Sequence, residues 1–142
     1  MKYLLDTNIL RYYAARHSTL VDNLDKRLPK EIGLPFIVLV EHLRGRFDAL
    51  LKAEPKNILR EQERLREAQN LLSDFEVVYL NEKAVAELTV LRRRVSTRKR
   101  YTDVVIAAMA LVDDHIIVTR NVNDFRDLLP AARIQNWVDQ VY

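Results

Sequence analysis

The chain has 142 residues, of which 49% are hydrophobic and 30% charged, and its net charge at neutral pH is +3. This size and composition predict a single globular domain over residues 1–142. Because cysteine is absent, disulfides, thiolate zinc sites and cysteine nucleophiles are excluded, and we expect a reducing, cytoplasmic location. No apolar run reaches the ~18 residues of a membrane-spanning helix, so we expect no membrane partner.

Short apolar runs alternate with helical patterns along the chain. Five runs predict strands, at residues 3–5, 32–34, 77–80, 115–119 and 133–137. Helices are predicted over residues 7–13, 20–28, 35–50, 57–72, 81–95 and 102–112, with a helical turn at 125–129. Strands that alternate with helices favour an α/β layer fold with a mainly parallel central sheet.

Three of the predicted helices have informative starts or faces. Pro35 is expected at the first position of the third helix, Asn81 at the N-cap of the fifth, and Thr102 at the N-cap of the sixth. The sixth helix is apolar nearly all round, which predicts burial. The third helix carries one apolar stripe, formed by Phe36, Val40, Leu43, Phe47 and Leu50. That stripe either completes the core or stays exposed for association with another chain.

Acidic residues fall where a parallel sheet places its ligand site. In such sheets the site lies beyond the carboxyl ends of the strands. Asp6 directly follows the first predicted strand, and Asp124 lies just past the fourth. Glu41 interrupts the apolar sequence of the third helix, and Asp103 lies in the first turn of the buried sixth helix. Two acids near strand ends and two on flanking helices predict a shared acidic crevice.

Each acid also has an ordinary structural interpretation. Asp6 and Asp124 could cap helices, Glu41 could pair with Arg44 on the next turn, and Asp103 could simply interact with the helix dipole. For Asp6 alone the cap is slightly favoured, and for Glu41 alone the surface ion pair is favoured. The placement that the four acids share indicates a site more strongly than any one of them.

The chemistry expected of such a crevice is metal-assisted. Carboxylates brought together repel one another unless a cation neutralises them. Oxygen ligands without sulfur suit Mg²⁺ or Mn²⁺, and such a cation can activate water to attack a phosphodiester. Other chemistries lack their signatures, because no serine lies in a nucleophile elbow, the histidines lack zinc-ligand spacing and the two glycines form no phosphate-binding loop.

A basic cluster precedes Asp103. Six of the nine residues from 92 to 100 are basic, namely Arg92, Arg93, Arg94, Arg98, Lys99 and Arg100. Such a cluster attracts nucleic-acid phosphates. It is equally explained as a solvated helix end, where cations interact favourably with the dipole. These six residues are therefore candidate RNA-binding residues, and both interpretations stay open.

Four segments resemble PIN-domain proteins and, among them, the VapC-like toxins of toxin–antitoxin pairs. They are Tyr-Leu-Leu-Asp-Thr-Asn-Ile-Leu at 3–10, Val-Leu-Val-Glu-His-Leu-Arg-Gly at 38–45, Thr-Asp-Val-Val-Ile-Ala-Ala-Met-Ala-Leu at 102–111 and Ile-Val-Thr-Arg-Asn-Val-Asn-Asp-Phe at 117–125. They occur in the family's order and extend over nearly the whole chain. The ordered set is therefore specific, although each segment alone is weak.

This resemblance implies a three-layer α/β/α sandwich and endonucleolytic cleavage of RNA with Mg²⁺ or Mn²⁺. It implies that Asp6, Glu41 and Asp103 are the principal metal-site acids. Relatives often carry an aspartate at the position of Asn121, so Asp124 is the expected fourth acid here. The residues expected to support the site are Thr7, Asn8, Thr119 and Asn121. The resemblance also implies a homodimer and, for a toxin, a small antitoxin partner.

Three alternatives stay open. Phosphoryl transfer through an aspartyl-phosphate at Asp6 needs a second acid two residues on, where the chain has Asn8. A catalytically inactive RNA-binding module predicts loss of acids, whereas all four candidate positions retain one. A PIN-type nuclease that processes RNA without being a toxin is not distinguished by this chain. Residues 98–102 lack the glycine that many relatives carry there, which concerns substrate preference more than chemistry.

Overall fold

A five-stranded sheet forms the centre of the structure, a computed structural model that describes residues 1–95 and 99–142. Its strands are β1 (Tyr3–Leu5), β2 (Ile32–Pro35), β3 (Glu76–Val78), β4 (Ile116–Val118) and β5 (Ile134–Gln135). They lie in the order β3-β2-β1-β4-β5, and every neighbouring pair is parallel. The predicted α/β class with a mainly parallel sheet is confirmed.

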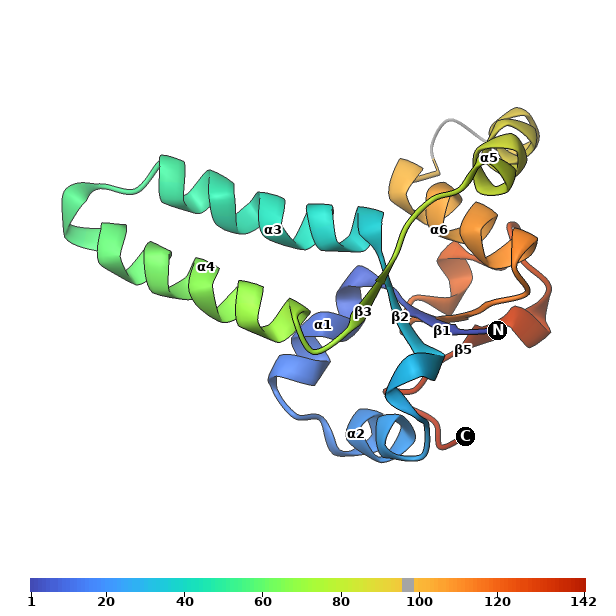
Figure 1. Cartoon of the computed structure of the whole chain (residues 1–142), viewed down its shortest axis with the longest axis horizontal. Helices are drawn as coiled ribbons and strands as arrows, with labels where there is room; N and C mark the ends of the chain where they lie inside the picture. The colour runs from blue at the N-terminus through green and yellow to red at the C-terminus, as the bar shows by residue number, and fades with distance from the viewer. Residues whose placement is uncertain (96–98) are drawn as a thin grey trace.

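Helices cover both faces of this sheet (Figure 1). They are α1 (Thr7–Ala14), α2 (Ser18–Asp25), α3 (Phe36–Leu51), α4 (Ile58–Leu72), α5 (Glu82–Arg94) and α6 (Tyr101–Val112). The connections from β1 to β2 and from β2 to β3 step one way, and the connection from β3 to β4 crosses back. Since such crossovers are right-handed, α5 and α6 lie on the opposite face from α1 and α2 (Figure 1). The result is the predicted α/β/α sandwich.

The strand order places the expected ligand site at the carboxyl ends of β1 and β4. These strands are neighbours, yet the chain leaves β1 toward β2 and leaves β4 toward β5, in opposite directions along the sheet. In open α/β sheets the ligand site lies at this point of divergence. Asp6 follows β1 and Thr119 follows β4, so both lie at the predicted edge.

The core lies where α6 packs on the sheet. Residues 103–110 of α6 are all buried, as predicted for a helix that is apolar nearly all round. The largest fully buried side chains include Trp137, Phe125, Leu4 and Ile106. Among the helices that the structure describes, none combines the length and the apolarity needed to cross a membrane.

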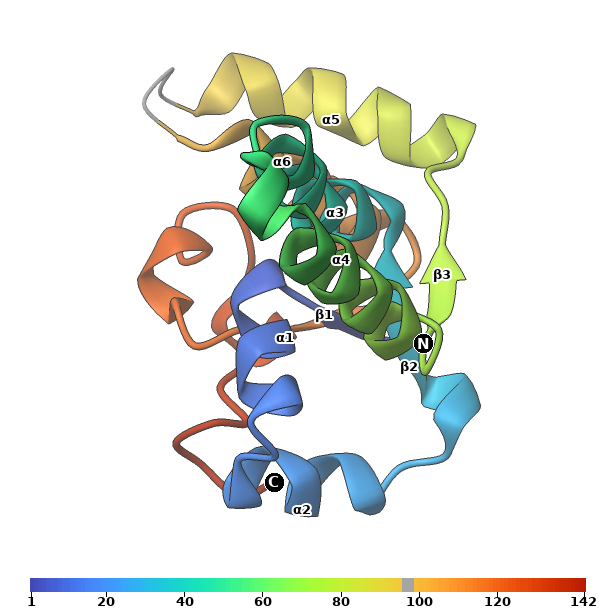
Figure 2. The same ribbon diagram turned by 90° about the vertical axis from the view of Figure 1, so that its left-hand side faces the viewer.

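The helices α3 and α4 form an antiparallel arm that projects from the body (Figures 1 and 2). The predicted stripe of α3 lies largely outside the core, because Phe36, Val40 and Phe47 are 39%, 41% and 44% exposed. Leu43 and Leu50 of the same stripe are half-buried. Of the two interpretations of this stripe, the one that leaves apolar surface exposed is supported.

Three predicted boundaries in the helices are wrong. The second helix, expected over 20–28, is α2 and ends at Asp25. Pro35 ends β2 and precedes α3 instead of opening it. Thr102 does not cap α6, which begins at Tyr101 with Arg100 as its N-cap residue. By contrast Asn81 caps α5 as predicted, since its Oδ1 accepts a hydrogen bond from the backbone N–H of Ala84 at 2.9 Å.

Two predicted strands differ from the structure. The strand expected at 77–80 as a buried element is β3, an edge strand whose residues are exposed or half-buried, and Tyr79 beyond it is 66% exposed. The last strand, expected at 133–137, has only two residues. It ends because Asn136 Oδ1 accepts hydrogen bonds from the backbone of Val138 and Asp139, which turns the chain and buries Trp137.

The two glycines of the chain offer a matched pair of variants. A Cβ on Gly33 in β2 would lie 2.6 Å from Cγ2 of Val78, whereas a Cβ on Gly45 in α3 would meet nothing within 4 Å. Gly33→Ala is expected to lower the free energy of unfolding by roughly 1–3 kcal/mol through overpacking. Gly45→Ala is expected to raise it by roughly 0.5–1 kcal/mol through helix propensity. Urea denaturation followed by circular dichroism measures both.

The expected loss of stability in Gly33→Ala is attributed to the close approach of the new Cβ to Val78. A double variant tests this attribution. If that contact is responsible, Val78→Ala costs less free energy of unfolding in the Gly33→Ala background than in the natural chain. Strictly additive costs would show that Gly33→Ala acts in some other way.

Candidate active site

Asp6 is the most firmly held of the predicted acids. It is only 5% exposed. Its Oδ1 accepts a hydrogen bond from the Thr7 backbone N–H at 2.8 Å, and its Oδ2 accepts from the Thr119 hydroxyl at 2.8 Å and from the Asn8 amide at 2.9 Å. Asp6 is thus the N-cap residue of α1 and also faces the end of β4. The cap interpretation of Asp6 is therefore confirmed, and its contact with Thr119 leaves the site interpretation open as well.

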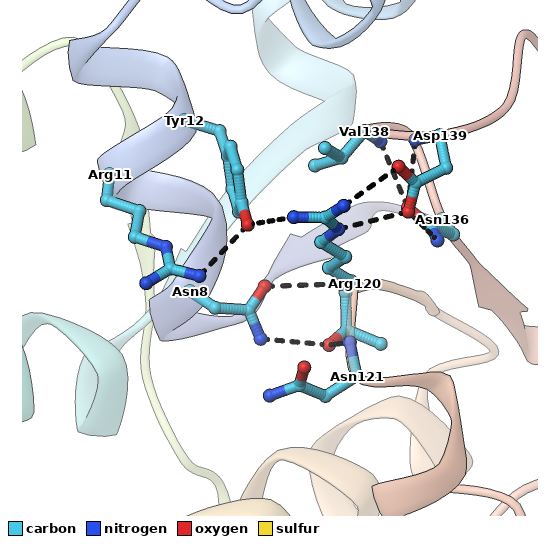
Figure 3. Close-up of polar contacts among 9 residues, drawn as sticks. Asn8, Arg11, Tyr12, Arg120, Asn121, Asn136, Val138 and Asp139 are labelled. Carbon is cyan, nitrogen blue, oxygen red and sulfur yellow. Dashed lines mark hydrogen bonds and ion pairs between the residues drawn. The ribbon is translucent and has the colours of Figure 1, made fainter.

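The predicted supporting residues assemble around Asp6. Thr119 is fully buried, and besides donating to Asp6 its hydroxyl accepts from the Asn8 amide at 3.2 Å and from the Asn121 backbone N–H at 3.0 Å. Asn8 Oδ1 in turn accepts from the backbone N–H of Arg120 at 3.2 Å (Figure 3). These contacts hold the carboxylate of Asp6 in one orientation. The hydroxyl of Thr7, by contrast, is buried without a hydrogen-bond partner among the described residues.

Among the four predicted acids, Asp103 is the one whose pKa is raised the furthest. It is 3% exposed in the first turn of α6. Burial, followed by the negative charge of Asp6, raises the pKa of Asp103 to about 6, with further contributions in the same direction from Asp124 and Glu41. Burial likewise raises the pKa of Asp6, against the hydrogen bonds from Thr119 and Thr7. The other three predicted acids therefore lie within electrostatic reach of Asp103.

Glu41 forms an ion pair, but with Arg100 and not with Arg44. Its Oε1 accepts a hydrogen bond from Nη2 of Arg100 at 2.5 Å, whereas the sequence predicted pairing with Arg44. Its Oε2 is buried and has no hydrogen-bond partner among the residues described. The same guanidinium is attracted by Asp103 and Asp6. Arg100 therefore acts as the chain's own cation beside the acids.

The basic cluster divides into two parts. Lys99 pairs with Asp127 at 2.8 Å and donates to the backbone oxygen of Asp124 at 2.7 Å, so it lies beside the site together with Arg100. Arg92, Arg93 and Arg94 form the last turn of α5, where the guanidinium of Arg92 lies 4.9 Å from the ring centre of Tyr101. The sixth predicted RNA-binding residue, Arg98, lies outside the described residues.

The oxygen atoms of the site are of the kind that bind a hard divalent cation, although among the described residues they do not form a complete set of ligands in this structure. Within residues 1–95 and 99–142, no three acidic or histidine side chains lie close enough together to hold a metal ion. The site nevertheless offers oxygen ligands alone, a buried Glu41 oxygen without a partner, and acids that raise the pKa of Asp103. Mg²⁺ typically takes only one or two carboxylates and retains several waters, so separated acids suit it.

A second polar network adjoins Asp6, and the sequence analysis missed it (Figure 3). The guanidinium of Arg120 donates to both oxygens of Asp139, at 3.1 and 3.3 Å, and to the hydroxyl of Tyr12. Arg11 donates to the same hydroxyl at 2.9 Å. Hydrogen bonds from Arg120 and then Arg11 lower the pKa of Tyr12. The only available signal was the position of Arg120, directly after the strand-end Thr119.

A comparison with models of known families gives a match over most of the chain. The family model described as the PIN domain matches residues 3–128. The chain belongs to the PIN domain family. Members of this family are generally nucleases. No curated protein matches the chain.

Several solved structures share this fold. VapBC-1 from nontypeable Haemophilus influenzae aligns with a TM-score of 0.70 and 23% identity, covering 96% of this chain and 98% of that one. DNA-bound VapBC from Salmonella typhimurium aligns with a TM-score of 0.74 and 21% identity, with the same coverage. VapBC2 from Rickettsia felis, bound to a promoter DNA fragment, aligns with a TM-score of 0.68 and 25% identity, covering 96% and 99%.

The raised pKa of Asp103 makes a prediction about stability. The folded state binds this proton more tightly than the unfolded state, since the pKa rises from 3.8 to about 6. Protonation thus stabilises the fold below about pH 4, and that stabilisation is lost as the pH rises through about 6. In EDTA at about pH 8, Asp103→Asn is expected to unfold with a free energy roughly 1–3 kcal/mol higher than the natural chain.

At about pH 4 the two proteins should have nearly equal free energies of unfolding, because Asp103 is then neutral like asparagine. Urea denaturation at both pH values measures the difference. Asp48→Asn, at an exposed position of α3, is the matched control and should show no such pH-dependent gain. A gain for Asp103→Asn that is independent of pH would contradict the electrostatic origin.

Proposed function

We propose that this PIN domain is an endoribonuclease that hydrolyses RNA phosphodiesters with Mg²⁺ or Mn²⁺. The observation that carries the proposal is the gathering of Asp6, Glu41 and Asp124 within electrostatic reach of the buried Asp103, near the carboxyl ends of β1 and β4. Membership of a nuclease family supports the reaction class. The oxygen-only donor set supports a hard divalent cation.

The four acids divide the work according to their surroundings. Asp6 and Asp103 are the direct ligands, because both are buried and Asp6 is fixed by three hydrogen bonds. Glu41 offers its unpartnered Oε2 as a further ligand or as an acceptor that orients the attacking water. Asp124, which is half-buried, helps to hold that water or a second ion. A bound divalent cation activates water and neutralises charge that develops on the phosphodiester.

We propose further that the nuclease is the toxin of a toxin–antitoxin pair. The solved relatives support this, since they include VapBC complexes and a toxin–antitoxin complex from Klebsiella pneumoniae that aligns with 21% identity and a TM-score of 0.65. A small antitoxin and a second copy of the chain are the proposed partners. Either would cover apolar surface on the α3–α4 arm, where Phe47, Leu51 and Leu59 are exposed. A PIN nuclease that processes RNA without an antitoxin is the alternative and would use the same acids.

Loss of Asp103 tests the chemistry directly. Asp103→Asn should cleave structured RNA in Mg²⁺ or Mn²⁺ roughly 100-fold or more slowly than the natural chain, because a ligand charge is lost. The variant should stay folded, since asparagine preserves the size and polarity of the side chain. Gel analysis of cleavage, together with circular dichroism, measures both properties. The proposed assignment fails if a well-folded Asp103→Asn cleaves RNA at the natural rate.

Matched variants sharpen the result. Asp6→Asn should lose cleavage to a similar degree, whereas Asp48→Asn on the exposed face of α3 should retain it. Addition of EDTA should abolish cleavage by the natural chain, and restored Mn²⁺ should recover it. Cleavage that persists in EDTA would exclude the metal-dependent mechanism.

The basic residues are proposed to contact RNA phosphates. Arg93 and Arg94 support this best, because they are exposed at the end of α5. Arg92, Arg98, Lys99 and Arg100 complete the proposed surface. Lys99 and Arg100 are already paired with Asp127 and Glu41, so their contribution to RNA binding should be smaller.

Salt dependence distinguishes phosphate contacts from a solvated helix end. For binding to single-stranded RNA in EDTA, the slope of log affinity against log salt should fall by roughly 0.7 for each contact removed. Arg93→Gln combined with Arg94→Gln is therefore expected to reduce the slope by about 1.4. Arg60→Gln combined with Arg66→Gln, on exposed positions of the α3–α4 arm, is the matched control. An equal reduction by both pairs would assign the effect to net charge alone.

A further inference from the structure

A polar cavity lies beside the candidate active site. It has a volume of about 600 Å³ and lies between residues 120–126, which follow β4, and residues 134–142 at the carboxyl end of the chain. Asp124 lines this cavity and is also the proposed fourth acid of the site. A ligand in the cavity would therefore lie next to the atoms at which the proposed cleavage takes place.

The walls of the cavity carry side chains that recognise polar edges. Asn121, Asn123 and Gln140 contribute amide groups, each with donors and an acceptor, and Arg126 contributes a cation. Within residues 1–95 and 99–142, no hydrogen bond occupies the side chains of Asn121, Asn123 or Arg126. These groups are exposed and are available to a ligand. Such a lining suits a flat polar molecule and disfavours an apolar one.

The opposite wall is held in place by buried contacts. Asn23 is fully buried, and its side chain bonds the backbone oxygens of Trp137 and Gln140, at 3.2 and 2.7 Å, and the backbone N–H of Tyr142 at 2.8 Å. The hydroxyl of Tyr142 donates to Gln140 Oε1 at 2.8 Å. The ring of Tyr142 is thereby positioned at the cavity while 39% of the residue remains exposed. An exposed, anchored ring is the kind of surface on which a base stacks.

Arg120 connects the cavity to the acids. Its guanidinium is fixed by Asp139 and Tyr12, and its backbone N–H donates to Asn8 (Figure 3). The amide of Asn8 in turn donates to Asp6. Arg11 lies on the other side of the Tyr12 hydroxyl. Oriented guanidinium groups at this border would receive the phosphates of a strand that passes from the cavity to the acids.

We propose that this cavity binds one nucleobase of single-stranded RNA next to the phosphodiester that is cleaved. The amides of Asn121 and Asn123 contact the edge of the base, Tyr142 stacks on its face, and Arg126 and Arg120 contact the flanking phosphates. Protein recognition of RNA sequence depends on unpaired bases that are stacked and hydrogen-bonded in this way. The proposal rests on the proposed nuclease function and adds to it the element that selects the RNA sequence.

Nucleotide titration in EDTA tests the cavity separately from cleavage. The probes are AMP, CMP, GMP and UMP, with ribose 5-phosphate as the probe that lacks a base, followed by ¹H–¹⁵N NMR of the chain. At least one nucleotide should bind more tightly than ribose 5-phosphate and shift signals of residues 120–126 and 134–142. Asn123→Ala and Tyr142→Leu should each weaken that binding by roughly 5-fold or more, whereas Asn70→Ala on the exposed face of α4 should not.

The outcomes separate the two proposals. Equal binding of ribose 5-phosphate and all four nucleotides would overturn the nucleobase site, as would natural affinity in both cavity variants. Base binding without any RNA cleavage would overturn the nuclease function and leave the cavity as a nucleotide site. If both hold, Asn123→Ala should flatten the preference for particular bases beside the cut, as read by sequencing of cleaved RNA ends.

Discussion

The hydrogen bond from the Thr119 hydroxyl to the buried carboxylate of Asp6 is the contact on which the site depends. It joins the ends of β1 and β4, which are also linked by the backbone N–H of Asp6 and the oxygen of Val118 at 3.0 Å. A carboxylate without partners would be costly at this depth. The Thr119 hydroxyl is one of three donors to this carboxylate. It is the donor that comes from the end of the neighbouring strand, so the pairing of β1 with β4 also helps to orient the acid.

Asp103 differs from Asp6 because hydrogen bonds do not offset the burial of its carboxylate. It is as buried as Asp6, yet among the described residues its carboxylate accepts no hydrogen bond from a side chain, and its neighbours are acids. The nearest compensation is Arg100, which is held at Glu41. The fold thus gathers more negative charge than its own cations offset. Repulsion of this kind is relieved by any cation that enters, whether a metal ion or a guanidinium from a partner chain.

The sequence predicted the parts of this architecture that follow from local pattern. The alternation of strands and helices, the burial of α6 and the position of Asp6 at a strand end all depend on neighbouring residues. It could not predict pairings between distant segments. Arg100 meets Glu41 across 59 positions, and Arg120 meets Tyr12 across 108. Nor could periodicity decide whether the stripe on α3 is buried, because that depends on whether α4 alone covers it.

The candidate acids, the polar cavity and the exposed stripe of α3 lie on largely separate parts of the structure. Asp6 and Asp124 come from the segments that follow β1 and β4, and Glu41 and Asp103 come from α3 and α6. The cavity is built mainly from the segments that follow β4 and β5, which carry a short 3-10 helix at Val122–Asp124 but no α-helix. The exposed apolar stripe lies on an arm that leaves the body (Figure 1). If the cavity and the arm bind partners as proposed, substitutions there can alter binding without disturbing the hydrogen bonds that hold Asp6.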